Sequence, residues 1–405
     1  MGLTPLPVLA SFQPMTQPPV YLDHAATTPV RPEVLEAMLP YLSTTWGNPS
    51  SAHRLGRLAR AGLDQARREV AEAVGAEPNQ VVFTSGGTES DNLAVIGASL
   101  AARDRGEPML AVVSAIEHKA VLAAAHQVVH LGGSERILPV DRQGRVSLEA
   151  LDQALADRAS VVSVMWANNE VGVMQPVGII ADRCHAAGVP FHTDAVQAFG
   201  KIPISIGSLP CTLLTLSGHK IGAPKGIGAL VVRTRGAVDA IIHGGGQQFG
   251  IRPGTENVAG AVALGRAALL AAREAEEESV RLGALRDELA RRLKAAVPDA
   301  VVHGEECERA PHVLSITAPG TDSEALLMHL DLAGICASSG SACSTGAVEP
   351  SHVLTALGVS RELALGAVRF SLGRESTGAD IDRVAQAYPG IVGKVRQLSV
   401  VLGRV

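Results

Sequence analysis

The sequence predicts an α/β fold with a mostly parallel sheet, helices on both faces, and a smaller α+β part after it. The first observation is that short apolar strand-like runs alternate with helical patterns between residues 81 and 217. The second is size, because 405 residues with 46% apolar side chains exceed what one core requires. The third is a change of pattern near Gly260, where a long helical segment rich in Ala, Glu and Arg begins.

In the first part, Pro32–Tyr41 and Ala52–Val74 show helical periodicity, and Gly75 is a natural stop for the second helix. The apolar stripe of that helix consists of Leu55, Leu58, Leu63, Ala66, Val70 and Val74. The predicted strands are Val81–Thr84, Met109–Ser114, Arg136–Pro139, Ser160–Trp166, Pro190–Asp194, the run from Leu213, and Gly228–Val232. The helices between them are Thr88–Arg103, His118–Leu131, Leu148–Ala156 and Val177–Ala187.

The second part begins with a predicted helix over Val262–Ala296, with breaks considered at Gly265 or Gly283. The strands expected after it are Val301–His303, Val313–Thr317 and Val368–Leu372, and the helices are Ser323–Leu332, Ser351–Leu357 and Asp380–Val401. We therefore expect a loose tail over residues 1–19, a large domain over 20–260 and a small C-terminal domain over 261–405. The first residues of the large domain are also candidates for packing against the small one.

Composition excludes several classes of protein. A net charge of −5 offers no general attraction to nucleic acid or to an anionic membrane, and no apolar run has the roughly 18 residues of a membrane helix. The start of the chain lacks the basic residues of a secretory signal. Five cysteines without a C-x-x-C pair indicate free thiols, no zinc site and a reducing cytoplasm. We expect no metal.

Lys220 is the first candidate for chemistry. It follows the apolar run from Leu213 and precedes a Gly/Pro turn, in L-L-T-L-S-G-H-K-I-G-A-P-K-G. Desolvation at the end of a buried strand disfavours the ammonium form, and a neutral amine can attack a carbonyl to form a Schiff base. The alternative is a surface lysine in a hairpin turn.

Ser85-Gly86-Gly87-Thr88 follows a strand and opens a helix, which makes it a candidate phosphate cradle. The alternative is an ordinary helix cap in which Thr88 or Ser85 accepts hydrogen bonds from the first turn. Neither the dinucleotide nor the triphosphate glycine motif occurs in the chain. Asp194 ends another strand, with Gln197 three residues later, and can face a cationic ring nitrogen, a metal or only a helix end. An imine-forming lysine, a carboxylate and a phosphate cradle together match pyridoxal phosphate.

Several other side chains are candidates for a functional role. His118, at a helix start, can stack on a flat ring, move protons or be structural, and His126 with His130 can share a metal only if a third ligand is supplied from elsewhere. Cys343 lies among Gly and Ser residues, which is typical of an exposed loop. Arg369 interrupts an apolar strand and requires an anion, either a substrate carboxylate or an internal salt bridge.

Ten short motifs stand in the order seen in cysteine desulfurases, between Tyr21 and the C-terminal helix. They are Y-L-D-H-A-A-T-T-P, N-P-S-S-A-H, F-T-S-G-G-T-E-S-D-N, N-N-E-V-G, F-H-T-D-A-V-Q, S-G-H-K, G-G-G-Q, R-P-G-T-E-N, S-S-G-S-A-C-S and R-F-S-L-G-R. The chain resembles the NifS/IscS-like branch of that family, pyridoxal-phosphate enzymes of the class V aminotransferase type. The resemblance implies fold type I of the pyridoxal-phosphate-dependent transferases. Departures are small: Gly87 replaces a frequent Ala, and Gln248 replaces a frequent Glu near the expected subunit contact.

The resemblance implies roles at the matching positions. Lys220 is expected to bind the cofactor covalently, with Asp194 at the ring nitrogen, Gln197 at the phenolic oxygen and His118 over the ring. The phosphate is expected to contact Gly87, Thr88, Ser217, His219 and the partner subunit's Thr255. Asn169 and Arg369 are expected to hold the substrate carboxylate, and Cys343 is the expected nucleophile.

The function that follows from the resemblance is conversion of L-cysteine to L-alanine, with sulfur held on Cys343 as a persulfide. The acceptor is then expected to be an iron–sulfur scaffold or a tRNA-thiolation relay, and the enzyme to be a cytoplasmic homodimer that binds neither nucleic acid nor membrane. Two alternatives remain: a related aminotransferase or selenocysteine lyase, and a sulfur-transfer platform without catalysis.

Overall fold

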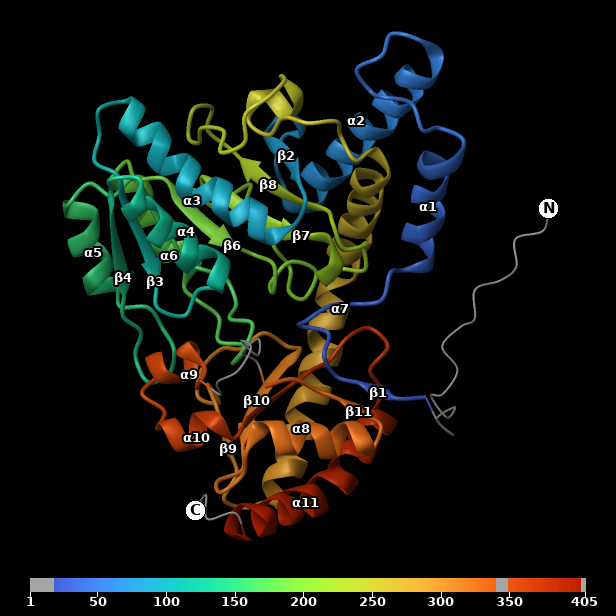
Figure 1. Ribbon diagram of the computed structural model, residues 1–405, viewed down its shortest axis with the longest axis vertical. Helices are drawn as coiled ribbons and strands as arrows, with labels where there is room; N and C mark the ends of the chain where they lie inside the picture. The colour runs from blue at the N-terminus through green and yellow to red at the C-terminus, as the bar shows by residue number, and fades with distance from the viewer. Residues whose placement is uncertain (1–17, 340–348, 402–405) are drawn as a thin grey trace.

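The computed structural model describes residues 18–339 and 349–401 (Figure 1). Its centre is a seven-stranded sheet, in which every strand except β8 runs in the same direction. In spatial order the strands are β2 (Val81–Thr84), β8 (Gly228–Val232), β7 (Leu213–Ser217), β6 (Phe191–Asp194), β5 (Val161–Ser163), β3 (Leu110–Ser114) and β4 (Ser134–Leu138). The predicted mostly parallel sheet is confirmed, although the strand predicted over Ser160–Trp166 is shorter than expected.

Helices cover both faces of the sheet, because successive side chains of each strand point to opposite faces. In β3, Val112 packs in the core on one face and Val113 packs in the core on the other. The helices α3 (Gly87–Asp104) and α4 (Lys119–His130) lie on the Val113 face. On the Val112 face lie α2 (Arg54–Val74), α5 (Leu148–Ala156), α6 (Val177–Ala186) and the first half of α7 (Val258–Ala296), with α1 (Pro32–Ser43) outside them.

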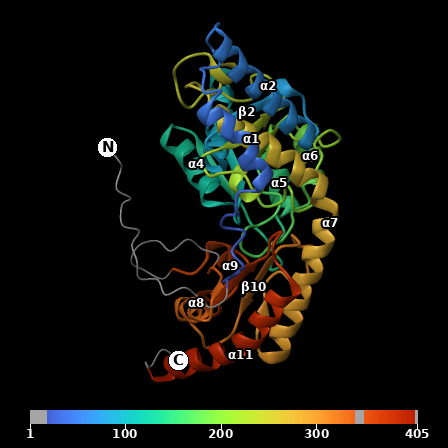
Figure 2. The ribbon, with the colours of Figure 1, turned by 90° about the vertical axis from the view of Figure 1, so that its right-hand side faces the viewer.

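The helix α7 is unbroken over 39 residues, so the breaks considered at Gly265 and Gly283 do not occur. Gly265 lies where α7 crosses α2, and a Cβ at this position would be 2.9 Å from the Cα of Ala66. A glycine costs about 1 kcal/mol in a helix interior, which the close packing of two helices offsets. Figure 2 shows α7 running along the molecule from its upper to its lower part.

The C-terminal part has its own core, to which the second half of α7 contributes Leu282, Leu289 and Leu293. Its antiparallel sheet consists of β12 (Ala367–Ser371), β10 (Val313–Thr317) and β9 (Val301–Val302), and its helices are α8 (Ser323–Leu332), α9 (His352–Ala356), α10 (Arg361–Leu365) and α11 (Gly378–Val401). Sequence analysis did not predict α10. Because α7 contributes to both cores, the domain boundary at residue 260 stays a prediction.

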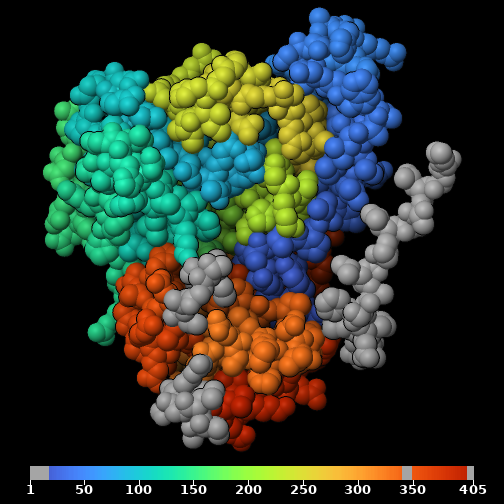
Figure 3. Space-filling view, in the orientation of Figure 1, coloured from blue at the N-terminus to red at the C-terminus, as the bar shows by residue number. Residues whose placement is uncertain are grey.

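The described chain begins at the junction of the two parts. The strand β1 (Val20–Tyr21) pairs with β11 (Ile335–Cys336), and Val20 and Leu22 pack in the C-terminal core. The following segment, Asp23–Thr28, lies between the two parts, as the blue surface across their border shows (Figure 3). Most of the predicted N-terminal tail lies outside the described residues.

Candidate functional site

A cavity of about 220 Å³ lies at the carboxyl ends of the parallel strands, the edge where such sheets bind ligands. Nine predicted site residues line it: Gly87, Thr88, His118, Asn169, Asp194, Gln197, Ser217, His219 and Lys220. They come from α3, from the residue before α4, from the segment after β5, and from the last residues of β6 and β7 and the segments that follow these two strands. The fold therefore brings together groups that lie up to 133 residues apart in the chain.

Lys220 ends a single 3₁₀ turn, Gly218–Lys220, directly after β7. Gly218 allows this tight turn, because a Cβ there would be 2.9 Å from Ile227. The amine Nζ donates hydrogen bonds to the carbonyl oxygens of Ala25 and Ala26, both at 2.6 Å. Burial, aided by the Arg369 charge, lowers the pKa of Lys220 to about 8. A substantial fraction of the amine is therefore neutral near physiological pH, as a nucleophilic amine must be.

The N-terminus of α3 opens into the cavity at Gly87. Among the described residues no side chain caps this helix, whose N-cap residue is Gly86, so neither Thr88 nor Ser85 has the alternative capping role. A Cβ at Gly87 would be only 3.2 Å from Val196, so a larger residue at this position would fill the space beside the first turn. Free backbone N–H groups and the helix dipole stabilise an anion by about 0.3–1 kcal/mol. The first turn of α3 is thus suited to a phosphate.

Asp194 ends β6 and is buried, and its Oδ1 accepts a hydrogen bond from the backbone N–H of Val196 at 2.8 Å. Burial raises the pKa of this carboxyl group, whereas the charges of His118 and Lys220 act in the opposite direction. A cation placed beside Asp194 would stabilise its charged form further. Gln197 donates from Nε2 to the carbonyl oxygen of Ala25 at 3.0 Å, the same oxygen that accepts from Lys220.

The two histidines of the cavity are held by different contacts. His118 is the N-cap of α4, and its Nδ1 accepts from the backbone N–H of Ala120 at 3.2 Å, which leaves Nε2 as its donor. His219 Nδ1 lies 3.1 Å from Thr27 Oγ1, and burial together with the Lys220 charge lowers the pKa of His219 to about 4. The imidazole of His219 is therefore neutral at pH 7.

Arg369 does not line the cavity, but it contacts Asn169, which does. Its guanidinium pairs with Asp23 at 2.9 Å through Nη2 and donates from Nη1 to the carbonyl oxygen of Asn169 at 2.8 Å. Its Nε is buried and has no hydrogen-bond partner among the described residues. The internal salt bridge considered from the sequence is present, and one donor remains for a further acceptor.

A further predicted residue, Thr255, does not line the cavity. Thr255 is exposed on the loop between η3 (Gln247–Gly250) and α7. Cys343 lies outside the described residues. The described positions on either side of it do reach the site, because Ser338 pairs through its backbone with Arg369 and His352 Nε2 lies 3.0 Å from the carbonyl oxygen of Glu117.

Sequence analysis missed three acidic residues at the site. Asp91 lines the cavity one helical turn after Thr88, Glu117 is buried directly before His118, and Asp23 pairs with Arg369. Asp23 and Asp91 lie inside two of the quoted motifs, and Glu117 directly precedes the candidate His118, so sequence proximity was the available signal. Their burial and partners depend on tertiary contacts.

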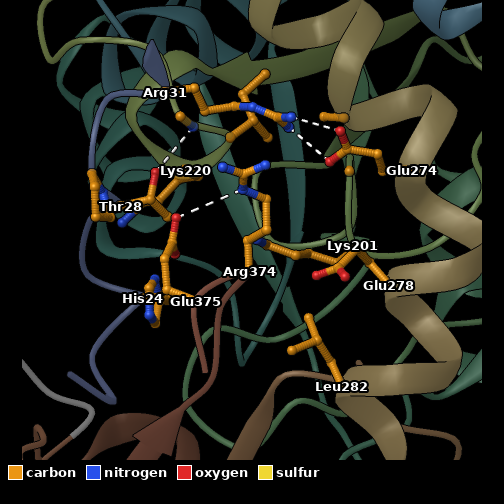
Figure 4. Close-up of a pocket in the computed structure, with 15 residues that line it drawn as sticks. His24, Thr28, Arg31, Lys201, Lys220, Glu274, Glu278, Leu282, Arg374 and Glu375 are labelled. Carbon is orange, nitrogen blue, oxygen red and sulfur yellow. Dashed lines mark hydrogen bonds and ion pairs between the residues drawn. The ribbon is translucent and has the colours of Figure 1, made fainter. Parts of the chain in front are cut away.

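A second cavity, of about 50 Å³, lies on the other side of Lys220 between the N-terminal segment and α7 (Figure 4). Arg31 spans it with a bidentate ion pair to Glu274, at 2.6 and 2.8 Å. This pair ties the segment that carries the Ala25 and Ala26 carbonyl groups to α7, which stabilises the position of Lys220.

No cluster of three or more metal-ligating side chains occurs within residues 18–339 and 349–401. The rings of His126 and His130 lie 4.8 Å apart, and Glu135 is 3.2 Å from the Nδ1 of His126. In the same part of the chain, no helix is both long and apolar enough to cross a membrane.

Comparison with known proteins gives consistent results. Residues 20–384 match the family described as aminotransferase class-V. A cysteine desulfurase IscS of Methanosarcina thermophila is 45% identical over 380 residues, which is 94% of this chain and 93% of that protein. A cysteine desulfurase of Cereibacter sphaeroides is 47% identical over 382 residues, 94% of this chain and 97% of the relative. A solved NifS-like protein has a TM-score of 0.86 at 34% identity, covering 93% of this chain and 100% of the other.

Proposed function

Because the chain belongs to the class-V aminotransferase family, among the cysteine desulfurases, we propose that it converts L-cysteine to L-alanine and receives the sulfur on Cys343 as a persulfide. The observation that carries this proposal is a single cavity that contains the Lys220 amine, the Asp194 carboxyl group and the open N-terminus of α3. These three groups match the aldehyde, the ring nitrogen and the phosphate of pyridoxal phosphate.

Pyridoxal phosphate, when bound, supplies an electron sink for the substrate's α-carbon. Lys220 would bind the cofactor covalently and, once released by substrate, would move the α-proton. Asp194 would hold the proton on the ring nitrogen, Gln197 would face the phenolic oxygen and His118 would stack on the ring. The phosphate would be held by Gly87, Thr88, Ser217 and His219.

The substrate carboxylate would bind between Asn169 and Arg369, where the Arg369 guanidinium has an unused buried donor. The Cys343 thiolate would then attack the substrate sulfur. The new S–S bond forms as the C–S bond breaks, and the electron pair of the C–S bond stays with the substrate carbon, which takes up a proton to give alanine. The persulfide would pass its sulfur to an acceptor, either an iron–sulfur scaffold or a tRNA-thiolation relay.

We further propose a homodimer in which the partner subunit's Thr255 completes the phosphate site. Four exposed apolar side chains on and after α1 support an association surface: Leu35, Leu39, Leu42 and Trp46. Replacing Leu39 with glutamate should shift the protein towards the monomer in light scattering, and an unchanged mass would argue against this surface.

Four free cysteines among the described residues support a cytoplasmic location.

The test is incubation of the purified protein with L-cysteine, followed by alanine analysis and by peptide mass measurement. We expect one added sulfur on the Cys343 peptide and equimolar alanine. Cys343→Ala should abolish both while the absorption of the bound cofactor persists. Lys220→Ala should remove that absorption.

Full turnover of the Cys343→Ala variant would favour an aminotransferase or a selenocysteine lyase. Absence of cofactor absorption in the unmodified protein would favour a platform without catalysis.

A further inference from the structure

A second carboxyl group faces the cavity beside Asp194, and the proposed mechanism does not use it. Asp91 lies on α3 one turn after Thr88 and is 1% exposed. Its Oδ1 lies 3.8 Å from His192 Nε2 and has no hydrogen-bond partner among the described residues. A buried carboxyl oxygen without a donor is unfavourable when the group is charged, because desolvation then costs most.

Among the described residues, no cation faces Asp91 from the elements packed against it. From β6, His192 contacts the Thr215 hydroxyl at 2.9 Å and the Ser163 hydroxyl at 2.8 Å, and burial lowers the pKa of His192 to about 3. This imidazole is therefore neutral. From β7, the Thr215 hydroxyl group hydrogen-bonds to Asp91 and lowers its pKa, in the direction opposite to burial. Burial is the main reason that the pKa of Asp91 is raised, and the carboxyl groups of its remaining titratable neighbours, Asp194 and Glu117, raise it further.

Of the carboxyl groups of Asp91, Glu117 and Asp194, that of Asp194 has the contacts that best stabilise a negative charge. Burial raises the pKa of Asp194 as well, but this carboxyl group accepts the Val196 N–H bond, and the Lys220 charge lowers its pKa. Glu117 is fully buried, has one oxygen without a partner among the described residues, and has its pKa raised by burial to about 8. Three buried carboxyl groups near one cavity cannot all ionise without strong repulsion.

We propose that Asp91 is a protonated, neutral carboxylic acid that positions the wall of the cavity and leaves Asp194 as its one anion. The role assigned to Asp194 rests on the proposed function, whereas the protonation of Asp91 is a property of the chain itself. A neutral acid has one donor and one acceptor, so an asparagine at position 91 reproduces its hydrogen bonding, and alanine does not.

The test combines infrared spectroscopy with cofactor binding on the full-length protein, prepared with and without pyridoxal phosphate. At pH 7 we expect carbonyl absorption from protonated carboxylic acids, part of which disappears in Asp91→Asn. In a Glu117→Gln background, the absorption that remains should be that of Asp91. This second variant decides the question if Asp91→Asn does not fold.

For pyridoxal phosphate, Asp91→Asn should keep the affinity within about threefold, because the amide replaces a neutral acid. Asp194→Asn should weaken binding by roughly ten- to a hundredfold, because it removes a charge-assisted hydrogen bond. Asp91→Ala should weaken binding, unlike Asp91→Asn, because alanine cannot make the hydrogen bonds of the acid. The proposal is overturned if Asp91→Asn leaves the infrared spectrum unchanged or weakens binding as much as Asp194→Asn. Failure of the wild-type protein to bind the cofactor would refute the proposed function, while the infrared result would still decide the state of Asp91.

Discussion

Replacing Lys220 with methionine in the cofactor-free protein should remove a pH dependence of stability that the unmodified chain has. The folded protein holds this lysine in a half-buried position, where burial and the Arg369 charge lower its pKa from 10.5 to about 8. Methionine keeps an unbranched apolar stem of similar length but carries no proton. The free energies of unfolding of the two proteins should therefore differ by an amount that changes with pH.

The magnitude follows from proton linkage. Between pH 8 and pH 10.5 the unfolded lysine binds more protons than the folded one, so the free energy of unfolding rises with pH in this window. A shift from 10.5 to about 8 is about 2.5 pH units, which corresponds to about 3 kcal/mol. Most of this penalty, about 2.5 kcal/mol, is relieved between pH 7 and pH 10.

The assay is urea denaturation of both proteins at intervals from pH 7 to pH 10. The stability of Lys220→Met relative to wild type should be greatest at pH 7, and this difference should fall by about 2.5 kcal/mol at pH 10. Lys225→Met is the matched control, because Lys225 lies on the same turn and is exposed. A Lys220→Met difference that stays constant with pH would refute the reasoning about the buried amine.

Three further outcomes follow from packing and charge. Gly265→Val should lower the free energy of unfolding by about 1–3 kcal/mol, because its side chain meets the backbone of α2. Gly283→Ala should be neutral or slightly stabilising, because its Cβ would make only an ordinary contact with Pro311 at 3.8 Å. Equal melting temperatures for the two variants would contradict the packing of α7. The free energy of unfolding of the wild type should fall as pH rises from 4.5 to about 8, because Glu117 binds its proton more tightly in the folded state than in the unfolded state. Glu117→Gln should reduce this fall. Identical pH profiles of the two proteins in urea denaturation would contradict this reasoning. Arg31→Met should cost about 1.5–3 kcal/mol by leaving Glu274 without its partner, and an unchanged urea midpoint would show that the pair contributes nothing.

Several site features were predictable because they depend on a short stretch of chain. An apolar strand followed at once by Gly218 and Lys220 places an amine at a strand end, whatever the rest of the fold. The Gly86-Gly87 pair before an amphipathic helix likewise predicts an open helix N-terminus. The parallel sheet was predictable from alternation of strands and helices, since parallel strands require such crossovers.

The sequence alone thus determined the family, the sheet and the residues that meet at its carboxyl edge, because local pattern and motif order carry that information. The tertiary structure decided what surrounds them: the Asp23–Arg369 pair joins residues 346 positions apart, and the carbonyl groups that hold Lys220 come from about 195 positions away. It also decided that α7 continues through Gly265, since close helix packing outweighs the weak local preference against glycine. Burial and the partners of a charge are properties of the packed chain, and they decide which carboxyl group of the site is ionised.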